Sequence, residues 1–541
     1  MTGNEKVATD RSAGGICQVE RKVYLVGGGI ASLAAAAFLI RDGGLRGQNI
    51  SIFDESGLAG GSLDGSGTPD AGYVIRGGRM FTDEAYTCTY DLLSSIPSLT
   101  NPDWTVRDEI RVFNEANPSH SRARLVRAGA KVDVSTLGLS NRDRLDLIEL
   151  MAASEESLGA KRIEDYFAPA FFKTNFWYMW ATTFAFEPWH SAVECRRYIQ
   201  RFIQEFPRIA TLAGVRRTPY NQYDSIVLPL TRWLETQGVQ FLMNTRVTDL
   251  DFRHGQNGKG VERIHCTRDG VPSEIAVESH DLVLVTNGSM TAGSRRGSMT
   301  SAPEPGTKTE GGSWALWERL ASRHADFGNP GVFNGKVDES KWLSFTVTLR
   351  DPRFFALMEK FTGNQAGTGG LVTFTDSNWL MSVVLAHQPH FINQPADVQV
   401  FWGYGLYPEE EGNYVGKKMS ACTGADILTE LAGHLPFDAR EALRPETSNC
   451  IPCMMPFITS QFMPRVNGDR PMVRPVGTTN IAFIGQFCEM PDDVVFTVEY
   501  SVRSAQTAVY SFLGVDRAVP PLYKGQHDLR VLLNAFRTMI Q

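Results

Sequence analysis

The glycine run Gly27–Gly29 constrains the fold of this chain more than any other feature, because of what flanks it. The apolar stretch Lys22–Val26 before it predicts a β-strand, and the alanine-rich stretch Ile30–Ile40 after it predicts a helix. Glycines at such a junction let the backbone turn tightly and approach a pyrophosphate. The free N–H groups and the positive dipole at the helix start favour the phosphate charge. The sequence therefore predicts a dinucleotide-binding unit.

The fingerprint of such a unit has glycine at three places and an acidic residue at the end of the next strand. Gly27 and Gly29 occupy the first two places, and Ser32 occupies the third, where a small residue allows close helix–strand packing. The next strand, in "NISIFDE", ends on Asp54 or Glu55, and either acid is placed to hold ribose hydroxyl groups. Strand, loop, helix, strand and acid together favour a real site over a chance glycine motif.

Length, charge and hydrophobicity exclude several classes of protein. A chain of 541 residues exceeds one compact core, so two or three domains are expected. A net charge of −7 without a basic stripe argues against a nucleic-acid partner. No apolar run of about 18 residues occurs, so no bilayer-spanning segment is predicted. Residues 1–17 are polar, lack the apolar core of a signal peptide and are predicted to form a disordered tail.

The eight cysteines are scattered, which favours a reducing cytoplasm over a disulfide-stapled secreted domain. Cys450 and Cys453 form a CxxC pair, and a redox pair needs a helix start to lower a thiol pKa. The two prolines of "CIPCMMPF" favour buried irregular chain there instead. No second CxxC or nearby histidine pair completes a zinc site, so no metal site is predicted.

A second strand–turn–helix pattern lies near the C-terminus, in "NIAFIGQFCEMPDDVVFTVEY". The strand runs to Ile484, a glycine turn follows, and a long helix is expected from about Val494. In flavoproteins with two dinucleotide-fold segments, a late glycine and an acid beside a helix start typically meet the flavin and its ribityl chain. Gly485 and Glu489 suit these roles. The alternative is an ordinary strand–turn–helix without a ligand.

The stretch Tyr166–Trp189 holds eleven aromatic residues. The polar residues that interrupt or follow it are Lys173, Asn175, Glu187 and His190, so it is no membrane span. Two interpretations stay open at this point. The segment is either a buried helical pair or the wall of a long apolar tunnel.

Several sequence blocks resemble a known family. They are "VGGGIASLAAA", "YVIRGGR", "FFKTNFW", "FAFEPWHSA", "ECRRYIQRFI", "YNQYDS", "VFWGYGLYPE" and "IPCMMPFITSQFMPR". Together they resemble the oleate hydratase family, which consists of bacterial FAD-containing fatty-acid hydratases once described as myosin-cross-reactive antigens. The resemblance covers the chain from about residue 20 to residue 515. It implies a hydro-lyase that adds water across the cis-9 double bond of oleate and gives 10-hydroxystearate.

The resemblance also implies that FAD is needed for this redox-neutral reaction, where the flavin shapes the site and supports charge near the alkene. The expected FAD contacts, besides the fingerprint residues, Gly485 and Glu489, are Ile30, Ala31, Gly61, Ser62, Arg76, Gly77, Gly78, Arg79, Val247, Asn287, Gly288 and Ser289. The remaining partners expected are a long-chain unsaturated fatty acid and water. The sequence leaves the choice between monomer and dimer open.

The predicted fold is α/β, with a discontinuous Rossmann-like FAD-binding domain, a large inserted α+β substrate domain and a C-terminal helical segment. The expected FAD-binding segments are 18–85, 218–300 and 473–515. The expected substrate-binding insertions are 86–217 and 314–472, and the helical segment is 516–541.

Hydration of an isolated alkene needs a positioned acid, a dry pocket that supports positive charge on carbon, and a group that activates water. A fatty acid further needs an apolar tunnel and a carboxylate anchor. The family's proton-donating tyrosine falls in the "RRY" block, which implies Tyr198, and Gln222 in "YNQY" matches a family carboxylate contact. Since a tyrosine pKa near 10 makes a weak acid, a neighbour must polarise Tyr198. The alternative is that Tyr198 only packs on a helix.

The sequence departs from the family pattern at the group that activates water. Most members have a glutamate after "RGGR", and this chain has Met80, which cannot accept a proton. The segment is one residue longer before Cys88, so Asp83 or Glu84 is predicted to project into the same space. Glu84 is preferred because its side chain is longer. The alternative is that both acids lie on a solvated loop.

A second departure concerns the substrate carboxylate. The family's Thr-x-Asn is Val384-Leu385-Ala386 here, and only His390 keeps a plausible anchoring group. Anchoring is therefore expected to differ from the family pattern.

The C-terminal segment "DLRVLLNAFRTMI" predicts an amphipathic helix. Its apolar residues at helical spacing are Leu529, Leu532, Leu533, Phe536 and Ile540, with Arg530 and Arg537 nearby. This face either docks peripherally on a membrane surface or covers the protein's own core, and the second is preferred.

Two further function classes stay open beside the hydratase. One is a flavin oxidoreductase on an apolar substrate, similar to amine oxidases or carotenoid desaturases. The other is a flavin or lipid carrier without catalysis. Formation of a labelled hydroxyl in heavy-oxygen water, without an electron acceptor, would distinguish the hydratase from both.

Overall fold

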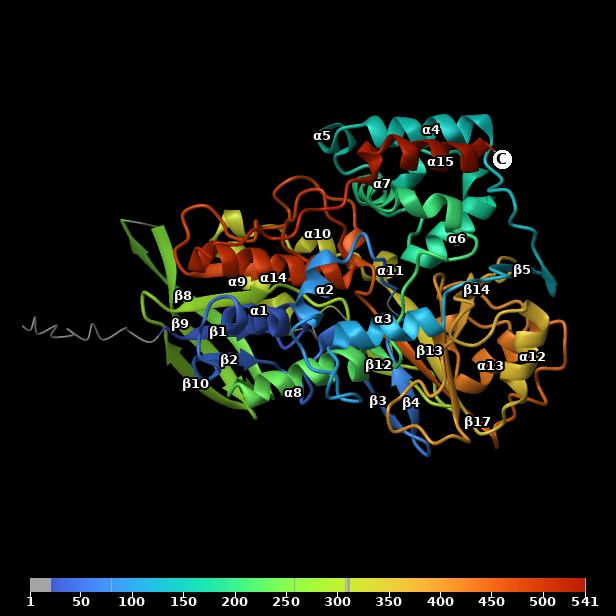
Figure 1. Ribbon diagram of the computed structural model, residues 1–541, viewed down its shortest axis with the longest axis horizontal. Coiled ribbons are helices and arrows are strands. Elements are labelled where there is room, and N and C mark those ends of the chain that lie inside the picture. The colour runs from blue at the N-terminus through green and yellow to red at the C-terminus, as the bar shows by residue number, and fades with distance from the viewer. Residues whose placement is uncertain (1–20, 79, 257, 307, 309–311, 541) are drawn as a thin grey trace, which may run out of the picture.

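The computed structural model describes residues 21–540 apart from 79, 257, 307 and 309–311. The predicted tail at 1–17 and the predicted FAD contact Arg79 lie outside the described residues. The chain folds into several sheets with helices between and around them (Figure 1).

A five-stranded sheet holds the N-terminal glycine unit. Its strands, in spatial order, are β18 (Ile481–Ile484), β11 (Leu282–Thr286), β1 (Val23–Val26), β2 (Ile50–Phe53) and β7 (Gln240–Leu242). Every neighbouring pair is parallel. β1 is apolar and buried along its whole length, as a strand covered on both faces requires. The chain passes from β1 to β2 on one side, while β11 pairs on the other, so the carboxyl end of β1 is a topological switch point.

This sheet confirms the predicted α/β fold and the assembly of its strands from stretches far apart in the sequence. The predicted domain boundaries are a finer statement and stay a prediction.

Two helices pack against each other beside the sheet, α1 (Ile30–Arg41) and α14 (Val498–Leu513) (Figure 1). α1 is apolar around its first three turns, and its small side chains let the neighbouring elements approach closely. Ser32, the third fingerprint position, is fully buried with its Oγ 3.4 Å from Oγ1 of Thr286 in β11. A small residue is therefore accommodated at this contact, as the sequence predicts.

α14 begins four residues later than the predicted start near Val494. The Thr497 side chain accepts a hydrogen bond from the Tyr500 N–H at 3.1 Å and caps the helix there. Asp492 and Phe496 both have positive φ, of 63° and 69°, so the chain before the cap is a tight irregular turn. The apolar run alone could not locate this cap.

The remaining strands form three further sheets. The eight-stranded sheet is β12 (Arg295–Arg296), β17 (Ser448–Met455), β13 (Trp342–Leu349), β16 (Gln399–Gly405), β15 (Met381–Leu385), β14 (Leu371–Phe374), β5 (Leu125–Arg127) and β6 (Ala130–Lys131). The three-stranded sheet is β10 (Val271–Ala276), β9 (Gly258–Arg268) and β8 (Thr245–Gly255). The hairpin is β3 (Gly65–Thr68) and β4 (Gly72–Ile75). Figure 1 shows the eight-stranded and three-stranded sheets at opposite ends of the long axis.

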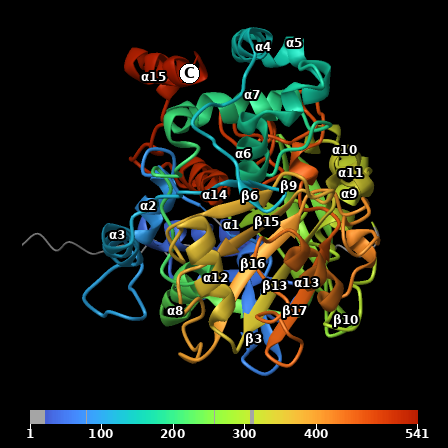
Figure 2. The ribbon, with the colours of Figure 1, turned by 90° about the vertical axis from the view of Figure 1, so that its right-hand side faces the viewer.

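The other helices cover and connect these sheets (Figures 1 and 2). They are α2 (Thr87–Leu93), α3 (Val106–Ala116), α4 (Asn141–Ala152), α5 (Glu155–Leu158), α6 (Asn175–Phe184), α7 (Ala192–Arg201), α8 (Leu228–Thr236), α9 (Gly312–Arg323), α10 (Gly331–Asn334), α11 (Val337–Ser340), α12 (Arg353–Thr362), α13 (Gly424–Gly433) and α15 (Leu529–Ile540). None of the helices in the described residues is long and apolar enough to cross a bilayer.

The CxxC pair lies in β17, so the expectation of irregular chain is wrong there. Both thiols are buried and free, and burial raises the pKa of Cys450 and raises that of Cys453 to about 11. A raised thiol pKa disfavours the thiolate that a redox pair needs.

α15 leaves most of the apolar face that the sequence singles out exposed, and of its five predicted residues only Leu532 is half-buried against the core. Leu529, Leu533, Phe536 and Ile540 are between 47% and 70% exposed. The helix packs through another face, which includes Ala535 and Met539, onto the segment Ile203–Arg208. Figure 2 shows α15 at the outer edge of the molecule.

Candidate functional site

A cavity of about 490 Å³ lies at the carboxyl end of β1, and we call it the glycine-loop cavity. Its size falls within the range of roughly 300–1,000 Å³ that is usual for ligand and cofactor sites. The predicted cofactor contacts that line it are Gly27, Gly29, Ile30, Ala31, Asp54, Glu55, Gly61, Ser62, Arg76, Val247, Gly288, Ser289 and Gly485. Thus segments separated by up to several hundred positions in the sequence meet around one space at the switch point.

The glycines shape the wall of this cavity in two ways. Gly27 has a φ of +99°, a conformation that L side chains rarely adopt. Gly29 precedes α1 with ordinary extended backbone, and a Cβ placed there would meet no atom within 4 Å. No side chain caps α1, so its first N–H groups and its positive dipole end lie at the cavity. An anionic group such as a pyrophosphate fits this place.

The two candidate ribose-binding acids have different surroundings. Asp54 accepts hydrogen bonds from the Gly28 N–H at 2.6 Å and from the Ser56 N–H at 2.8 Å, which ties the acid to the glycine loop. Glu55 forms an ion pair with Arg246 at 2.8 Å and is only partly buried. Glu55 is therefore the acid with more freedom to exchange its partners for ribose hydroxyl groups.

Several residues that line this cavity were not predicted from the sequence, namely Gly28, Arg246, Thr286, Gln486 and Ser501. The consecutive glycines were a signal for Gly28, whose Cβ would lie 2.8 Å from Oδ2 of Asp54. Arg246 lies in β8, Thr286 ends β11, Gln486 follows β18 and Ser501 lies in α14, and the sequence holds no motif that marks them.

Four predicted cofactor contacts lie elsewhere among the described residues. Gly77 and Asn287 do not line the cavity, and the buried Asn287 amide has no hydrogen-bond partner in the described chain. Gly78 lines two other cavities. The Glu489 carboxylate is held by Arg197 at 2.8 Å and by Arg465. Glu489 thus belongs to a buried ion-pair cluster.

Two smaller, largely apolar cavities share the residues Gly78, Met80, Thr183 and Phe496. The first, of about 80 Å³, contains Tyr198 in its wall and is called the Tyr198 cavity. The second, of about 120 Å³, contains Gln222 and His390 and is called the Gln222 cavity. The shared residues make the two cavities neighbours along one apolar path.

The aromatic segment has both of the roles that the sequence left open. Most of its rings pack on one another, such as Phe167 on Phe171 and Phe176 on Trp180. Only the end of α6 and the residue after it, Thr182 to Ala185, reach the two apolar cavities. The segment is mainly a buried helical support, and its last turn forms the cavity wall.

Tyr198 lies on α7 and is 1% exposed. Its hydroxyl donates a hydrogen bond to the Val495 carbonyl at 2.5 Å. Its ring is surrounded by Phe184, Phe186 and Phe202, with centroid distances from 5.0 to 5.5 Å. The phenol is therefore a polar group in an apolar wall, oriented by the turn before α14.

The acids near Met80 point away from the apolar path. Met80 lines both cavities, whereas Asp83 pairs with Arg216 at 2.7 Å and its side chain is 59% exposed. Glu84 pairs with Arg208 at 3.0 Å, with 33% of its side chain exposed. Neither acid lines either cavity in the described chain. Backbone hydrogen bonds between Phe81 and Arg216 fix the direction of this segment.

The Gln222 cavity brings Gln222 and His390 together, as a shared carboxylate site requires. Burial lowers the pKa of His390 to about 4, so this imidazole is neutral at pH 7. Arg217 is the only permanently charged side chain among the described residues of this cavity. It was not predicted as a site residue from the sequence.

Arg217 lacks a carboxylate partner within the described chain. Its Nη1 donates to the Gly367 carbonyl at 2.5 Å, and its Nη2 is buried without a hydrogen-bond partner there. Burial lowers the pKa of Arg217 to about 10, which leaves it charged at neutral pH. The nearby Arg124 is also buried, and it donates to the carbonyls of Leu371 and Ile209. This end of the path therefore carries uncompensated positive charge and suits an anion.

Two segments connect the glycine-loop cavity with the apolar path. One runs from Arg76, in the first cavity, to Gly78 and Met80, in the other two. The other runs from Gln486, in the glycine-loop cavity, to Thr497, in the Tyr198 cavity. The Gln486 side chain donates a hydrogen bond to the Thr497 carbonyl at 2.9 Å. A ligand group at the inner end of the glycine-loop cavity would therefore lie close to the apolar path.

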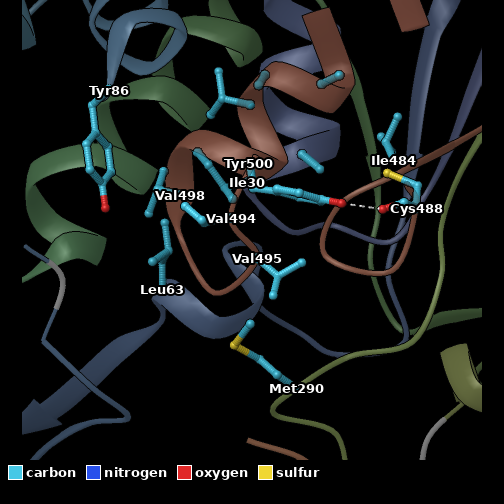
Figure 3. Packing of buried hydrophobic residues seen from close by; sticks show 14 of the residues in the cluster. Ile30, Leu63, Tyr86, Met290, Ile484, Cys488, Val494, Val495, Val498 and Tyr500 are labelled. Carbon is cyan, nitrogen blue, oxygen red and sulfur yellow. Dashed lines mark hydrogen bonds between the residues drawn. The ribbon is translucent and has the colours of Figure 1, made fainter. Parts of the chain in front are cut away.

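Figure 3 shows the packing behind this connection. Val494 and Val495, before α14, lie near Ile30 and Leu63, and the Tyr500 hydroxyl donates to the Cys488 carbonyl at 2.6 Å (dashed line). This packing holds the start of α14 against the glycine-loop unit.

Comparison with protein families matches residues 20–510 to the MCRA family. The chain belongs to the MCRA family. Two curated relatives match nearly the whole chain. An oleate hydratase from Streptococcus pyogenes serotype M49 (strain NZ131) is 44% identical over 99% of this chain and 92% of the relative. A linoleate hydratase from Lactiplantibacillus plantarum is 35% identical over 97% of this chain and 100% of the relative.

The chain also shares its fold with a solved oxidase. Cyclohexylamine oxidase from Brevibacterium oxydans IH-35A superimposes with a TM-score of 0.51 at 13% identity, covering 92% of this chain and 99% of that one. At this identity the likeness shows the fold alone. The family resemblance predicted from the sequence blocks is confirmed.

Proposed function

We propose that this protein is a fatty-acid hydratase that adds water across the cis-9 double bond of oleate and forms 10-hydroxystearate. The observation that carries the proposal is the apolar path itself, which has a tyrosine hydroxyl in one wall and uncompensated positive charge at its other end. A long apolar substrate with one carboxylate matches that arrangement. The names of the two curated relatives support the same activity.

FAD is proposed as the ligand of the glycine-loop cavity. The open space at Gly29, the uncapped start of α1 and the partly buried Glu55 fit a pyrophosphate and a ribose. Arg76, Val247, Ser289 and the other lining residues named above would complete the contacts. When bound, the flavin supplies polarisable charge beside the path through which the alkene would pass.

In the proposed reaction, Tyr198 delivers its hydroxyl proton to one alkene carbon, and a water oxygen bonds to the other carbon. The apolar rings around Tyr198 exclude bulk water, which strengthens the electrostatic effect of each remaining polar group. Before substrate binds, the hydroxyl proton lies in the hydrogen bond to the Val495 carbonyl at 2.5 Å, so the hydroxyl turns from this carbonyl to the alkene as it donates. Positioning of this acid is the contribution of the protein that the geometry supports most directly.

The substrate carboxylate is proposed to bind among Arg217, Gln222 and His390. Arg217 contributes the charge, while Gln222 and the neutral imidazole contribute hydrogen bonds. This set would replace the hydroxyl and amide that Val384 and Ala386 cannot provide.

Replacement of Arg217 by methionine is expected to raise the KM for oleate at least about tenfold, because a hydrogen bond to a charged group contributes about 1.5–3 kcal/mol. Methionine keeps much of the apolar stem, so cavity packing changes little. The KM for methyl oleate, which lacks the negative charge, should change far less and serves as the control. An equal rise for acid and ester would show that Arg217 does not recognise the carboxylate.

The activity is tested by incubating the FAD-loaded protein with oleate in heavy-oxygen water without an electron acceptor. We expect one labelled hydroxyl per product molecule, detected by mass spectrometry. Hydrogen peroxide or acceptor-dependent desaturation would instead identify a flavin oxidoreductase and refute the hydratase.

The exposed face of α15 is proposed to contact a membrane surface, where fatty acids are concentrated. Leu529, Leu533, Phe536 and Ile540 share one face of the helix, and Arg530 and Arg537 are exposed beside it. We expect Leu533→Ser/Phe536→Ser to weaken binding to vesicles of anionic phospholipid. Arg232→Ser, an exposed change on α8, serves as the control. Unchanged vesicle binding by the double variant would contradict this role.

A further inference from the structure

Glu205 lies in the wall of the Tyr198 cavity, together with Tyr198 and Met80. It belongs to the 3₁₀ segment Ile203–Arg208 that follows α7, and it is 5% exposed. It is the only carboxylate among the described residues of the two apolar cavities. The chain therefore has a buried acid on the same cavity wall where the family pattern leads to Met80.

The surroundings of Glu205 distinguish it from the two acids that follow Met80. One Arg208 nitrogen, Nη2, donates to Glu205 at 2.7 Å and to Glu84 at 3.0 Å, so Arg208 lies between them. Glu205 is on the inner side of this arginine and lines the cavity, while Glu84 is on the partly exposed outer side. Asp83 lies farther out, with Arg216.

We propose that Glu205 is the base that activates water in this protein, in place of the glutamate that Met80 replaces. The inference rests on the proposed hydratase function and deepens it. As the alkene π pair takes the Tyr198 proton and forms a C–H bond, a water oxygen forms the C–O bond to the other carbon. Glu205 accepts the proton that the water loses. Proton exchange with solvent then returns one proton to Tyr198 and removes one from Glu205, so the net change is addition of one water.

The surroundings of Glu205 make it a stronger base than an exposed glutamate. Burial raises its pKa, and Arg208 opposes that rise; Glu84 raises the pKa further and Arg216 lowers it, with a net pKa above the ordinary value. Tyr523, in the segment before α15, also faces this group, and burial together with the charges of Glu84 and Glu205 raises its pKa. Because the ionised form accepts the proton, activity should fall as pH drops through this raised pKa.

The decisive variant is Glu205→Gln, measured with the FAD-loaded protein and oleate. We expect kcat to fall at least about a hundredfold, the lower range for a lost general base, with KM and FAD absorbance close to those of the parent. Glu84→Gln and Asp83→Asn make the same chemical change on acids outside the cavity and should keep kcat within a few fold. Parental kcat in Glu205→Gln would overturn the proposal.

Two further variants separate catalysis from a structural ion pair. Arg208→Met breaks the same pair but keeps the carboxylate, so it should stay active while its acidic pH limb moves upward, because a cation that lowers the Glu205 pKa is lost. Met80→Glu/Glu205→Gln returns a carboxylate to the same cavity and should regain at least tenfold of the lost kcat. A low kcat that this second carboxylate does not rescue, with a lowered unfolding temperature, would assign Glu205 a structural role and overturn the proposal.

The same measurements distinguish a failure of the hydratase function from a failure of the role of Glu205. If the parent forms no labelled hydroxy acid, the hydratase function fails and the role of Glu205 fails with it. If the parent hydrates oleate and Glu205→Gln does so equally well, only the role of Glu205 is refuted.

Discussion

Tyr198→Phe is expected to lower the turnover of oleate at least about a hundredfold while FAD stays bound, because it removes the proposed acid. The substitution deletes one oxygen atom and keeps the ring that packs on Phe184, Phe186 and Phe202. Loss of the hydrogen bond to Val495 should cost about 1–3 kcal/mol of the free energy of unfolding, because the buried Val495 carbonyl loses this donor. Single-turnover kinetics with oleate and the flavin spectrum measure the two properties separately.

A matched control is available in the same cavity. Tyr86 also lines the Tyr198 cavity, so Tyr86→Phe removes a hydroxyl from the same wall. We expect Tyr86→Phe to keep turnover within about tenfold of the parent, below the lower range for a general acid. Equal losses in both variants would point to general polarity of the cavity, and near-parental turnover of Tyr198→Phe would remove Tyr198 from the mechanism.

The local sequence pattern was sufficient to predict the strand, turn and helix of the glycine-loop unit. β1 and α1 lie within one residue of their predicted bounds, since an apolar run, a glycine turn and an alanine-rich run are each determined by neighbouring residues. The start of α14 was misplaced because its cap, Thr497, follows a turn with two residues of positive φ. Apolar periodicity carries no information about such a turn.

The candidate site was harder to predict because its chemistry depends on contacts between distant segments. The spacing after Met80 placed two acids near the right sequence position, yet pairing of Phe81 with Arg216 directs both toward solvent. Arg217 is recognised as a candidate anchor only because its buried Nη2 lacks a hydrogen-bond partner in the described chain. No sequence motif marks such a residue.

The buried face of the C-terminal helix could not be predicted from the sequence for a different reason. Its sequence contains an apolar face, and α15 leaves most of that face exposed while it buries Ala535 and Met539. Ala535 and Met539 lie beside the stripe of exposed apolar residues, and the flexible Met539 side chain can adapt to the surface of Ile203–Arg208. Which face of an amphipathic helix is covered therefore depends on the shape of its neighbour.

Gly29→Val is expected to yield a folded protein that retains no FAD after gel filtration. Gly29 has ordinary extended backbone, with φ −76° and ψ 175°, so a valine there is not strained. Its side chain would enter the open space of the glycine-loop cavity, where a Cβ meets no atom within 4 Å. That space, next to the uncapped start of α1, is where the pyrophosphate is proposed to bind. The flavin absorbance of the purified protein measures the loss.

Two further variants test whether Gly29→Val loses FAD because its side chain blocks the cofactor site. Gly27→Val should also abolish FAD retention, but its φ of +99° and a Cβ only 3.1 Å from Cβ of Thr286 predict an additional loss of stability. Ser32→Ala changes a buried position of the same helix that does not line the cavity, so it should keep its flavin. Circular dichroism and the unfolding temperature of the apoproteins should therefore place Gly29→Val with the parent and Gly27→Val below it. Full flavin content in Gly29→Val would mean that the pyrophosphate does not lie against this glycine, and the assignment of FAD to the cavity would have to be abandoned.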